Sequence, residues 1–443
     1  MNIPENFLSE FHSRTLLFAR SAFVSNMGDE KYAERLATVK IAITGTRQHF
    51  ESANGQYALL MLISLLSRFC LKIDIVFSAD VKTVIKHPFI SDRYFVSNLL
   101  NLARLINPVI DITVSDGTLK RYDFVVVVGD QSGDRGKSVF INSDGWIAYV
   151  NTESNSISWV SKNINPVGAY VAACMGAAEL FKAIFAKYQQ RPRIGSLIFS
   201  AFDYGFRTMP LYNPPIPPSV NINDINFISM GAINSAVLYT LCSISGAIIE
   251  ASIVEPENLD VSNLNRYAFS LAEDAINKIS KIDSALKFAG SNLNTKRLIK
   301  LPFEKITDPL DTNDLAVIGV DNVEGRWAVQ RGNPSQVLCG GTTGTGEIQI
   351  STFSKTEEGA CMGCLYPEPL PTGTIPTISF VSILSGVLMA GEIIKARVGD
   401  FELCRMRNNL NLSMLSTQYY QYRNISIYDC CPIHQRTNAK SVE

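Results

Sequence analysis

The sequence predicts an α/β protein built from two tandem, doubly wound parallel sheets. Two continuous β-branched runs, Tyr122–Gly129 and Leu315–Val320, have the composition of strands buried on both faces of a parallel sheet. Each run follows an earlier apolar strand and precedes a long helix of small and apolar residues, at 168–187 and 377–396. This shared order of elements predicts a degenerate tandem repeat.

The two halves are predicted to be Rossmann-like domains at residues 1–190 and 224–443. In the first, a polar helical segment precedes an apolar strand at Val39–Gly45, a helix and a second strand. The stretch 191–223 is rich in proline, which suits an extended, semi-rigid linker.

Composition excludes several classes of protein. Of 443 residues, 46% are hydrophobic and 18% are charged, and the net charge is −1. Nucleic-acid binding needs a positive surface, so nucleic acid is not an expected partner. The N-terminus has no apolar signal region, and no run reaches the ~20 apolar residues of a spanning helix. We therefore expect a cytoplasmic protein without a membrane partner, in which the nine cysteines serve metal or thiol chemistry rather than disulfides.

The second half opens with a nucleotide-binding βαβ pattern. A short apolar strand meets a tight turn at Gly231, and a helix of small residues follows. The next strand ends in Glu255 and Glu257, where an acid would accept from a ribose hydroxyl. The turn reads Ser-Met-Gly-Ala-Ile-Asn and keeps one glycine of the usual three, so the backbone is expected to approach phosphate less closely.

Cationic and amide side chains follow this strand. The segment Ser262–Arg266 reads SNLNR and supplies Asn263 and Arg266, and Lys278 comes twelve residues after the arginine. These groups lie where a triphosphate would need them. Lys281 lies one helical turn further on and is the alternative to Lys278 if the spacing from Arg266 is counted differently.

An acid also follows the buried strand at 315–320. Asp321-Asn322 stands at its carboxyl end, beside the nucleotide crevice, where Asp321 is well placed to hold Mg²⁺. The alternative is an aspartate that only caps the next helix.

Two knuckles of metal-ligand spacing are far apart in the second half. Cys361-x-x-Cys364 and Cys431-x-x-His434 supply four ligands for a tetrahedral zinc site, with Cys430 as an alternative to Cys431. Four protein ligands leave no open position, so the predicted Zn²⁺ is structural and joins two distant segments.

Taken together, these motifs resemble the ThiF/HesA/MoeB superfamily, the bacterial relatives of ubiquitin-activating enzymes. That family has a Gly-rich turn, an acid-x-acid pair, S-N-L-x-R, a downstream lysine and paired C-x-x-C knuckles, the first followed by L-[FY]-P-x-P as in 364–369 here. The resemblance implies that ATP is bound by Gly231, Glu255, Glu257 and Asn322, together with Asn263, Arg266 and Lys278. It also makes Asp321 the ligand of the Mg²⁺ that bridges the ATP phosphates.

The resemblance further implies an inactive N-terminal half and an active C-terminal half, because the first half lacks the acid pair, S-N-L-x-R and the knuckles. In related enzymes, an arginine from the partner's N-terminus enters the active site. Arg14 is the candidate here and Arg20 the second choice; the alternative is an arginine on the surface of an N-terminal helix.

The implied reaction is ATP-dependent adenylation of the C-terminal carboxylate of a ubiquitin-like protein. Transfer to a conjugating enzyme would follow, as in bacterial conjugation systems, some of them antiviral. The alternative substrate is a small peptide or a sulfur-carrier protein, in peptide-natural-product or cofactor biosynthesis. A catalytically dead scaffold or an oxidoreductase is the hypothesis from another class, and a homodimer is a further candidate assembly.

The sequence has no clear nucleophile for a later thioester step. The loop 372–378, where relatives carry the nucleophile, has no cysteine. Cys339 is the first candidate and Cys404 the second; the alternative is that both are buried structural thiols.

Overall fold

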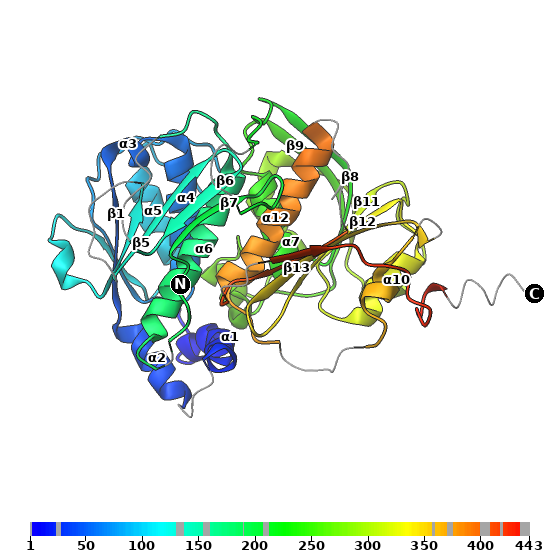
Figure 1. The fold of residues 1–443 in the computed structure, drawn as a ribbon, viewed down its shortest axis with the longest axis horizontal. Coiled ribbons are helices and arrows are strands. Elements are labelled where there is room, and N and C mark those ends of the chain that lie inside the picture. The colour runs from blue at the N-terminus through cyan, green and yellow to red at the C-terminus, as the bar shows by residue number, and fades with distance from the viewer. Residues whose placement is uncertain are drawn as a thin grey trace, which may run out of the picture.

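The computed structural model describes residues 2–23, 28–129, 137–153, 160–188, 190–206, 212–356, 359–369, 375–398, 408–416 and 420–434. Two twisted sheets lie on opposite sides of the molecule, and long helices fill the space between them (Figure 1).

The N-terminal sheet has the strand order β3-β2-β1-β4-β5-β6-β7. Strands β1 to β5 are parallel to one another, whereas β6 and β7 are antiparallel to their neighbours. The strands are β1 (Lys40–Gly45), β2 (Lys72–Ile75), β3 (Asp111–Val114), β4 (Phe124–Val128), β5 (Ser138–Asp144), β6 (Ile147–Asn151) and β7 (Ser196–Ser200).

The C-terminal sheet repeats this order as β10-β9-β8-β11-β12-β13-β14 and adds β15 at its edge. The tandem repeat of topology is therefore confirmed. The strands are β8 (Val220–Ile228), β9 (Ala247–Val254), β10 (Leu293–Ile299), β11 (Leu315–Ile318), β12 (Gln336–Thr342), β13 (Glu347–Ser354), β14 (Asn409–Ser413) and β15 (Tyr420–Arg423).

The predicted parallel arrangement holds for only part of each sheet, because both sheets are mixed. In each half, the last parallel strand turns back through a short hairpin, as at Gly145, where φ is 58°. A hairpin of this kind joins only antiparallel strands. The predicted linker is also partly ordered into the sheet, since β7 lies inside 191–223 and β8 begins at Val220.

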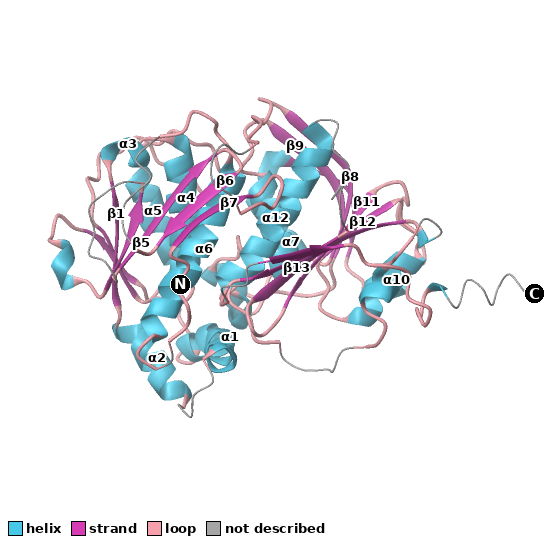
Figure 2. Cartoon of the chain, viewed as in Figure 1, coloured by secondary structure: helices cyan, strands magenta, loops and turns pink. Residues whose placement is uncertain are grey.

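Helices cover the sheets and separate them (Figure 2). The α-helices are α1 (Phe7–Ala22), α2 (Asp29–Thr38), α3 (Arg47–Phe50), α4 (Ala53–Leu66), α5 (Phe95–Ile106), α6 (Pro166–Phe185), α7 (Ala232–Leu241), α8 (Ala272–Ile276), α9 (Lys281–Ala289), α10 (Val323–Arg331), α11 (Met362–Leu365) and α12 (Ser379–Val398). Single 3₁₀ turns are η1 (Leu119–Arg121), η2 (Val261–Asn263), η3 (Gly290–Asn292) and η4 (Phe303–Lys305).

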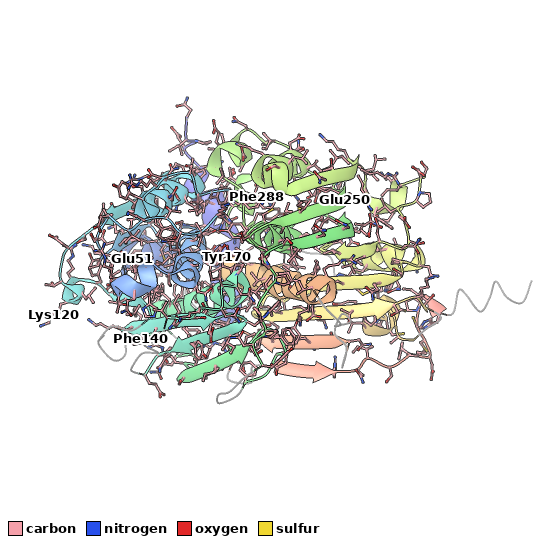
Figure 3. The ribbon with its side chains drawn as sticks, turned by 90° about the horizontal axis from the view of Figure 1, so that it is seen from above. Glu51, Lys120, Phe140, Tyr170, Glu250 and Phe288 are labelled. Atoms are coloured by element: carbon pink, nitrogen blue, oxygen red, sulfur yellow. The ribbon has the colours of Figure 1, made fainter. Side chains whose placement is uncertain are left out.

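The two halves share one hydrophobic core. Helix α12 packs against both α7 and α6, and α6 packs against α4. At this boundary Tyr170 lies 5.6 Å from Tyr239 between ring centroids, and Tyr239 stacks on Phe288 at 5.5 Å (Figure 3 labels Tyr170 and Phe288). The halves are therefore continuous through aromatic packing rather than joined by the linker alone.

Helices α6 and α12 are long and apolar enough to cross a membrane by length and composition. However, 94% of the apolar window of each is buried between the sheets, as expected of core helices.

Candidate active site

A cavity of about 330 Å³ opens in the C-terminal half, beside the carboxyl ends of β8, β9 and β11. Ligands of open α/β sheets bind at this edge, because the loops that leave the strands diverge there. Its wall includes Gly231, Glu255, Arg266 and Asp321, which the sequence assigned to one site.

The turn between β8 and α7 is held by an acid. Glu255 is 3% exposed, and its carboxylate accepts from the Met230 amide at 2.7 Å and from the Ser229 hydroxyl at 3.1 Å. Ser229 adopts a φ of 68°, a conformation that favours glycine. Glu255 also accepts from the Glu257 amide at 2.9 Å, so these hydrogen bonds stabilise a turn that has lost two glycines.

Arg266 lies at the cavity wall, just after η2. Its Nη1 donates to the Ser262 carbonyl and to Asn265 Oδ1, both at 2.8 Å. Burial lowers the pKa of Arg266; the charge of Arg14 lowers it further, whereas Asp321 raises it. Arg14, Arg266 and Asp321 are therefore close enough to act on one another electrostatically.

Asn263 does not line the cavity. Its Oδ1 accepts from the Asp260 amide at 3.0 Å, which completes a capping box with Asp260 around η2. This amide therefore shapes the loop that carries Arg266 instead of facing the cavity.

The lysine at the cavity is Lys281, the alternative considered above. Lys281 is 4% exposed, lines the cavity and forms an ion pair with Glu257. Burial would lower the pKa of Lys281, but Tyr267, Glu255 and Glu257 outweigh it and raise the pKa. Lys278 is exposed outside the cavity, in a turn with φ of 50°, because α9 begins only at Lys281.

Arg14 reaches the cavity from the N-terminal half. It lies on α1, and its Nη1 donates to the Ile375 carbonyl at 3.4 Å. Phe7 and Phe11 of the same helix pack in one apolar cluster with Leu264. Arg20 points elsewhere and pairs with Asp29 at 3.0 Å.

Asp321 and Asn322 follow β11 and line the cavity. The cap of α10 is Asn322, whose Oδ1 accepts from the Gly325 amide at 2.5 Å. Within the described part of the chain, the Asp321 carboxylate has no hydrogen bond or ion pair. Asp321 is therefore free to bind a cation, with Asn322 as a neighbouring oxygen ligand.

Two residues of the cavity wall were missed by the sequence analysis. Arg326 donates through Nε and Nη2 to the Val320 carbonyl at 3.2 and 3.1 Å, and its guanidinium lies 4.8 Å from the Tyr366 ring centroid. Tyr267 lies between two cations, with its ring centroid 5.3 Å from both Arg266 Cζ and Lys281 Nζ. For Tyr267, the sequence signal is that it follows Arg266 directly. For Arg326, it is a position in the first turns of the helix that follows Asp321.

Cys339 does not suit the role of a nucleophile. It is buried on β12 and does not line the cavity, and its thiol donates to the Gly340 carbonyl at 3.7 Å. Burial raises the pKa of Cys339, although Arg326 partly opposes this, whereas a reactive cysteine needs a lowered pKa. Cys404 and residues 372–374 of the predicted thioester loop lie outside the described residues.

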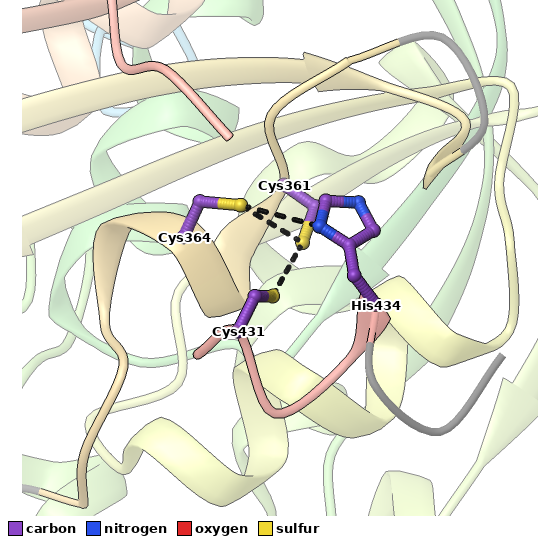
Figure 4. A group of neighbouring side chains, drawn as sticks. All are labelled: Cys361, Cys364, Cys431 and His434. Atoms are coloured by element: carbon purple, nitrogen blue, oxygen red, sulfur yellow. Dashed lines mark hydrogen bonds between the residues drawn. The ribbon is translucent and has the colours of Figure 1, made fainter. Parts of the chain in front are cut away.

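The four predicted zinc ligands meet in space (Figure 4). Cys361 Sγ lies 3.9 Å from Cys364 Sγ and 3.5 Å from Cys431 Sγ, and Cys364 Sγ lies 3.5 Å from His434 Nδ1. Zn–S bonds of about 2.3 Å at tetrahedral angles would put sulfur atoms about 3.8 Å apart, so the group could hold zinc. His434 Nε2 lies 3.2 Å from the Thr356 carbonyl, an outer partner that would leave Nδ1 for the metal. Cys430 is exposed and lies outside the group.

The equivalent crevice of the N-terminal half is filled by protein. Helix α3 is inserted between β1 and α4, and Phe50 stacks on Phe77 with centroids 4.0 Å apart. The His49 ring packs so closely on Gly129 that a Cβ there would lie 2.1 Å from Nδ1. In the C-terminal half, by contrast, Gly231 leads directly into α7.

Comparisons with known proteins find one family model and several similar sequences and structures. A family model described as the BilD N-terminal domain matches residues 40–191. A Sinorhizobium fredii protein, "Uncharacterized protein y4jF", is 27% identical over 79% of this chain and 63% of its own length, so the chain spans less than two thirds of that relative. A Thermus thermophilus sulfur carrier protein adenylyltransferase is 26% identical over 39% of this chain and 68% of its own length. The Debaryomyces hansenii adenylyltransferase and sulfurtransferase UBA4 is 28% identical over 40% of this chain and 41% of its own length.

Among solved structures, Escherichia coli MccB in complex with a form of MccA is 13% identical, with a TM-score of 0.39 over 47% of this chain and 66% of that chain. MccB with ATP gives a TM-score of 0.37 and 14% identity over 48% of this chain and 65% of that chain. The chain is therefore similar in sequence to ThiF/MoeB-type adenylyltransferases, and the motifs that carry this resemblance are gathered at one edge of the C-terminal sheet.

Proposed function

We propose that this protein catalyses ATP-dependent adenylation of the C-terminal carboxylate of a ubiquitin-like protein. The observation that supports this most is the convergence of Arg14, Arg266, Lys281 and Asp321 on one cavity beside the turn at Gly231. These residues come from four separate segments and both halves of the chain. A scaffold or an oxidoreductase would not need Arg14, Arg266 and Lys281 together with Asp321 at one cavity.

In the proposed reaction, a carboxylate oxygen of the substrate attacks the α-phosphorus of ATP. The new C–O–P link forms as the bond to the β-phosphate oxygen breaks, so that pyrophosphate leaves. Negative charge spreads over the phosphate oxygens in the transition state, where Arg14, Arg266 and Lys281 stabilise it from fixed positions. Glu255 and Glu257 keep lone pairs for the ribose hydroxyls while they hold the turn and Lys281.

Asp321 and Asn322 would hold Mg²⁺, which when bound supplies positive charge to the phosphates. We assign Zn²⁺ to Cys361, Cys364, Cys431 and His434, where it would tie the segment after β13 to the C-terminal segment. Both assignments rest on the chemistry of the donor sets.

We further propose that the N-terminal half is an inactive partner domain. This is supported by Phe50 and His49, which occupy its crevice. Its contribution to the reaction is then Arg14, which takes the place of an arginine from a second subunit. A homodimer is therefore not needed to complete the site.

A small peptide or a sulfur-carrier protein is the alternative substrate, since both also end in a carboxylate. We expect the reaction to occur in the cytoplasm, because none of the eight described cysteines forms a disulfide. A conjugating enzyme is the expected acceptor if the substrate is ubiquitin-like, with a thioester as the intermediate between them.

ATP–pyrophosphate exchange tests the proposal. The full chain is incubated with ATP, labelled pyrophosphate and a candidate ubiquitin-like protein, sulfur carrier or peptide. Exchange that requires one of these and is lost when its C-terminal carboxylate is amidated supports adenylation. Absence of exchange with every class would refute it.

A further inference from the structure

Arg68 is a fully buried cation that belongs to the N-terminal half but binds the C-terminal half. It follows α4 and is 0% exposed. Its Nη1 donates to the Leu264 carbonyl, and its Nη2 donates to the Ala268 carbonyl at 2.9 Å. These two carbonyls bracket Arg266, one of the proposed phosphate-binding cations.

Arg68 has no anionic partner within the described residues. No ion pair involves it, and its Nε has no hydrogen-bond acceptor. The ionisable group that acts on it is Tyr239 of α7, whose own pKa is raised by burial, so the phenol is neutral. Burial lowers the pKa of Arg68 to about 9, so the guanidinium is still charged at pH 7.

An unpaired buried charge is costly, and proteins usually pair it or replace it with apolar groups. Here the compensation comes from two backbone carbonyls of a single segment. That segment is also held by its surroundings: the Ala268 amide donates to Ser235 Oγ at 3.1 Å, and Asn265 Nδ2 donates to the Thr377 carbonyl at 3.0 Å. Arg68 is the charged member of this set of contacts.

We propose that Arg68 is a positioning residue through which the N-terminal half fixes the conformation of the segment 264–268 and hence the place of Arg266. This inference rests on the proposed function. It gives the inactive half a second task beside the supply of Arg14. Arg68 itself does not line the cavity, so its effect on ATP is expected to pass through the segment.

The test compares Mg·ATP binding by titration calorimetry in the full chain for wild type, Arg68→Met and Arg68→Lys. Arg35→Met is the matched control, because Arg35 also donates to a backbone carbonyl, that of Ile184 at 3.2 Å, but inside the N-terminal half. Loss of a hydrogen bond between a guanidinium and a charged group weakens binding by about 10- to 100-fold. We therefore expect Arg68→Met to raise the Kd for Mg·ATP by about 10- to 100-fold, and Arg35→Met to leave it unchanged.

The Arg68→Lys variant distinguishes an effect of the positive charge at this position from an effect of side-chain packing. A buried lysine has a lowered pKa, so its charge is lost as pH rises. We expect this variant to bind Mg·ATP nearly as wild type at pH 6.5 and more weakly at pH 8.5, while wild type changes little. Hydrogen exchange of 259–270 should rise in parallel with the loss of affinity.

Four outcomes are decisive. Wild-type affinity in a folded Arg68→Met variant overturns the inference, as does an equal loss in Arg35→Met. If Arg68→Met does not fold, wild-type affinity of Arg68→Lys at both pH values overturns it. If wild type itself does not bind Mg·ATP, the proposed function fails, and that result is distinct from a failure of the Arg68 inference.

Discussion

Replacement of Arg14 by methionine should separate catalysis from stability. In the free protein, Arg14 is half-buried, and its hydrogen bond is a 3.4 Å contact with the Ile375 carbonyl. Loss of one such bond changes the free energy of unfolding by about 1 kcal/mol. A preorganised donor to transition-state charge contributes about 2.7–4 kcal/mol. Since about 1.4 kcal/mol is tenfold in rate, kcat should fall by about 100- to 1,000-fold.

The assay is ATP–pyrophosphate exchange at saturating substrate, with thermal unfolding measured on the same samples. Arg20→Met is the control, because Arg20 lies on the same helix but pairs with Asp29 at the surface. We expect its rate and Tm to match wild type. An Arg14→Met enzyme that keeps wild-type kcat would refute the assignment of the N-terminal half to the active site.

Other substitutions test the cavity, the metal group and Cys339. Lys281→Met should lower kcat by about 100-fold or more, as the loss of a phosphate-binding cation, whereas Lys278→Met should leave the exchange rate unchanged. Tyr267→Phe keeps the ring between the two cations, so its rate should stay within a few-fold of wild type, but Tyr267→Ala should not. Cys364→Ala should lose the bound zinc, measured by elemental analysis, and should lower Tm, because a structural metal site contributes folding energy. Cys339→Ala should retain adenylation, and a reduction-sensitive conjugate that survives in this variant excludes Cys339 as the thioester site.

Much of the site could be predicted because local patterns encode it. The acids after β9, the SNLNR segment and the aspartate after β11 are all fixed by where a strand ends. Parallel strands bring these ends to one edge, so sequence order was enough to gather Glu255, Arg266 and Asp321. The two Cys/His knuckles could be predicted from the spacing of their residues, and His434 lies with the three cysteines as expected.

The choice between Lys278 and Lys281 depended on where α9 begins, and the sequence contains a signal for that position. Ser280 accepts from the Asp283 amide at 3.0 Å and caps α9. This cap places Lys281 in the first turn, facing inward, and leaves Lys278 in the preceding turn. Reading Ser-x-x-Asp as a capping signal would have favoured Lys281.

Long-range contacts were beyond the sequence pattern. Arg68 and Leu264 are 196 positions apart, and the single sequence gives no sign that they meet. The insertion of α3 that fills the N-terminal crevice is likewise visible only when Phe50 and Phe77 are seen stacked. Such contacts depend on how α4, α6, α7 and α12 pack, which periodicity alone does not specify.

The central claim is that this cavity converts a carboxylate into an acyl-adenylate, and oxygen transfer tests it most directly. A candidate ubiquitin-like protein with an ¹⁸O-labelled C-terminal carboxylate is incubated with the enzyme and ATP, and the released nucleotide is analysed by mass spectrometry. The account predicts AMP that carries one ¹⁸O, with none formed by an Asp321→Asn enzyme. Release of ADP with labelled phosphate, or of AMP without label, would contradict it.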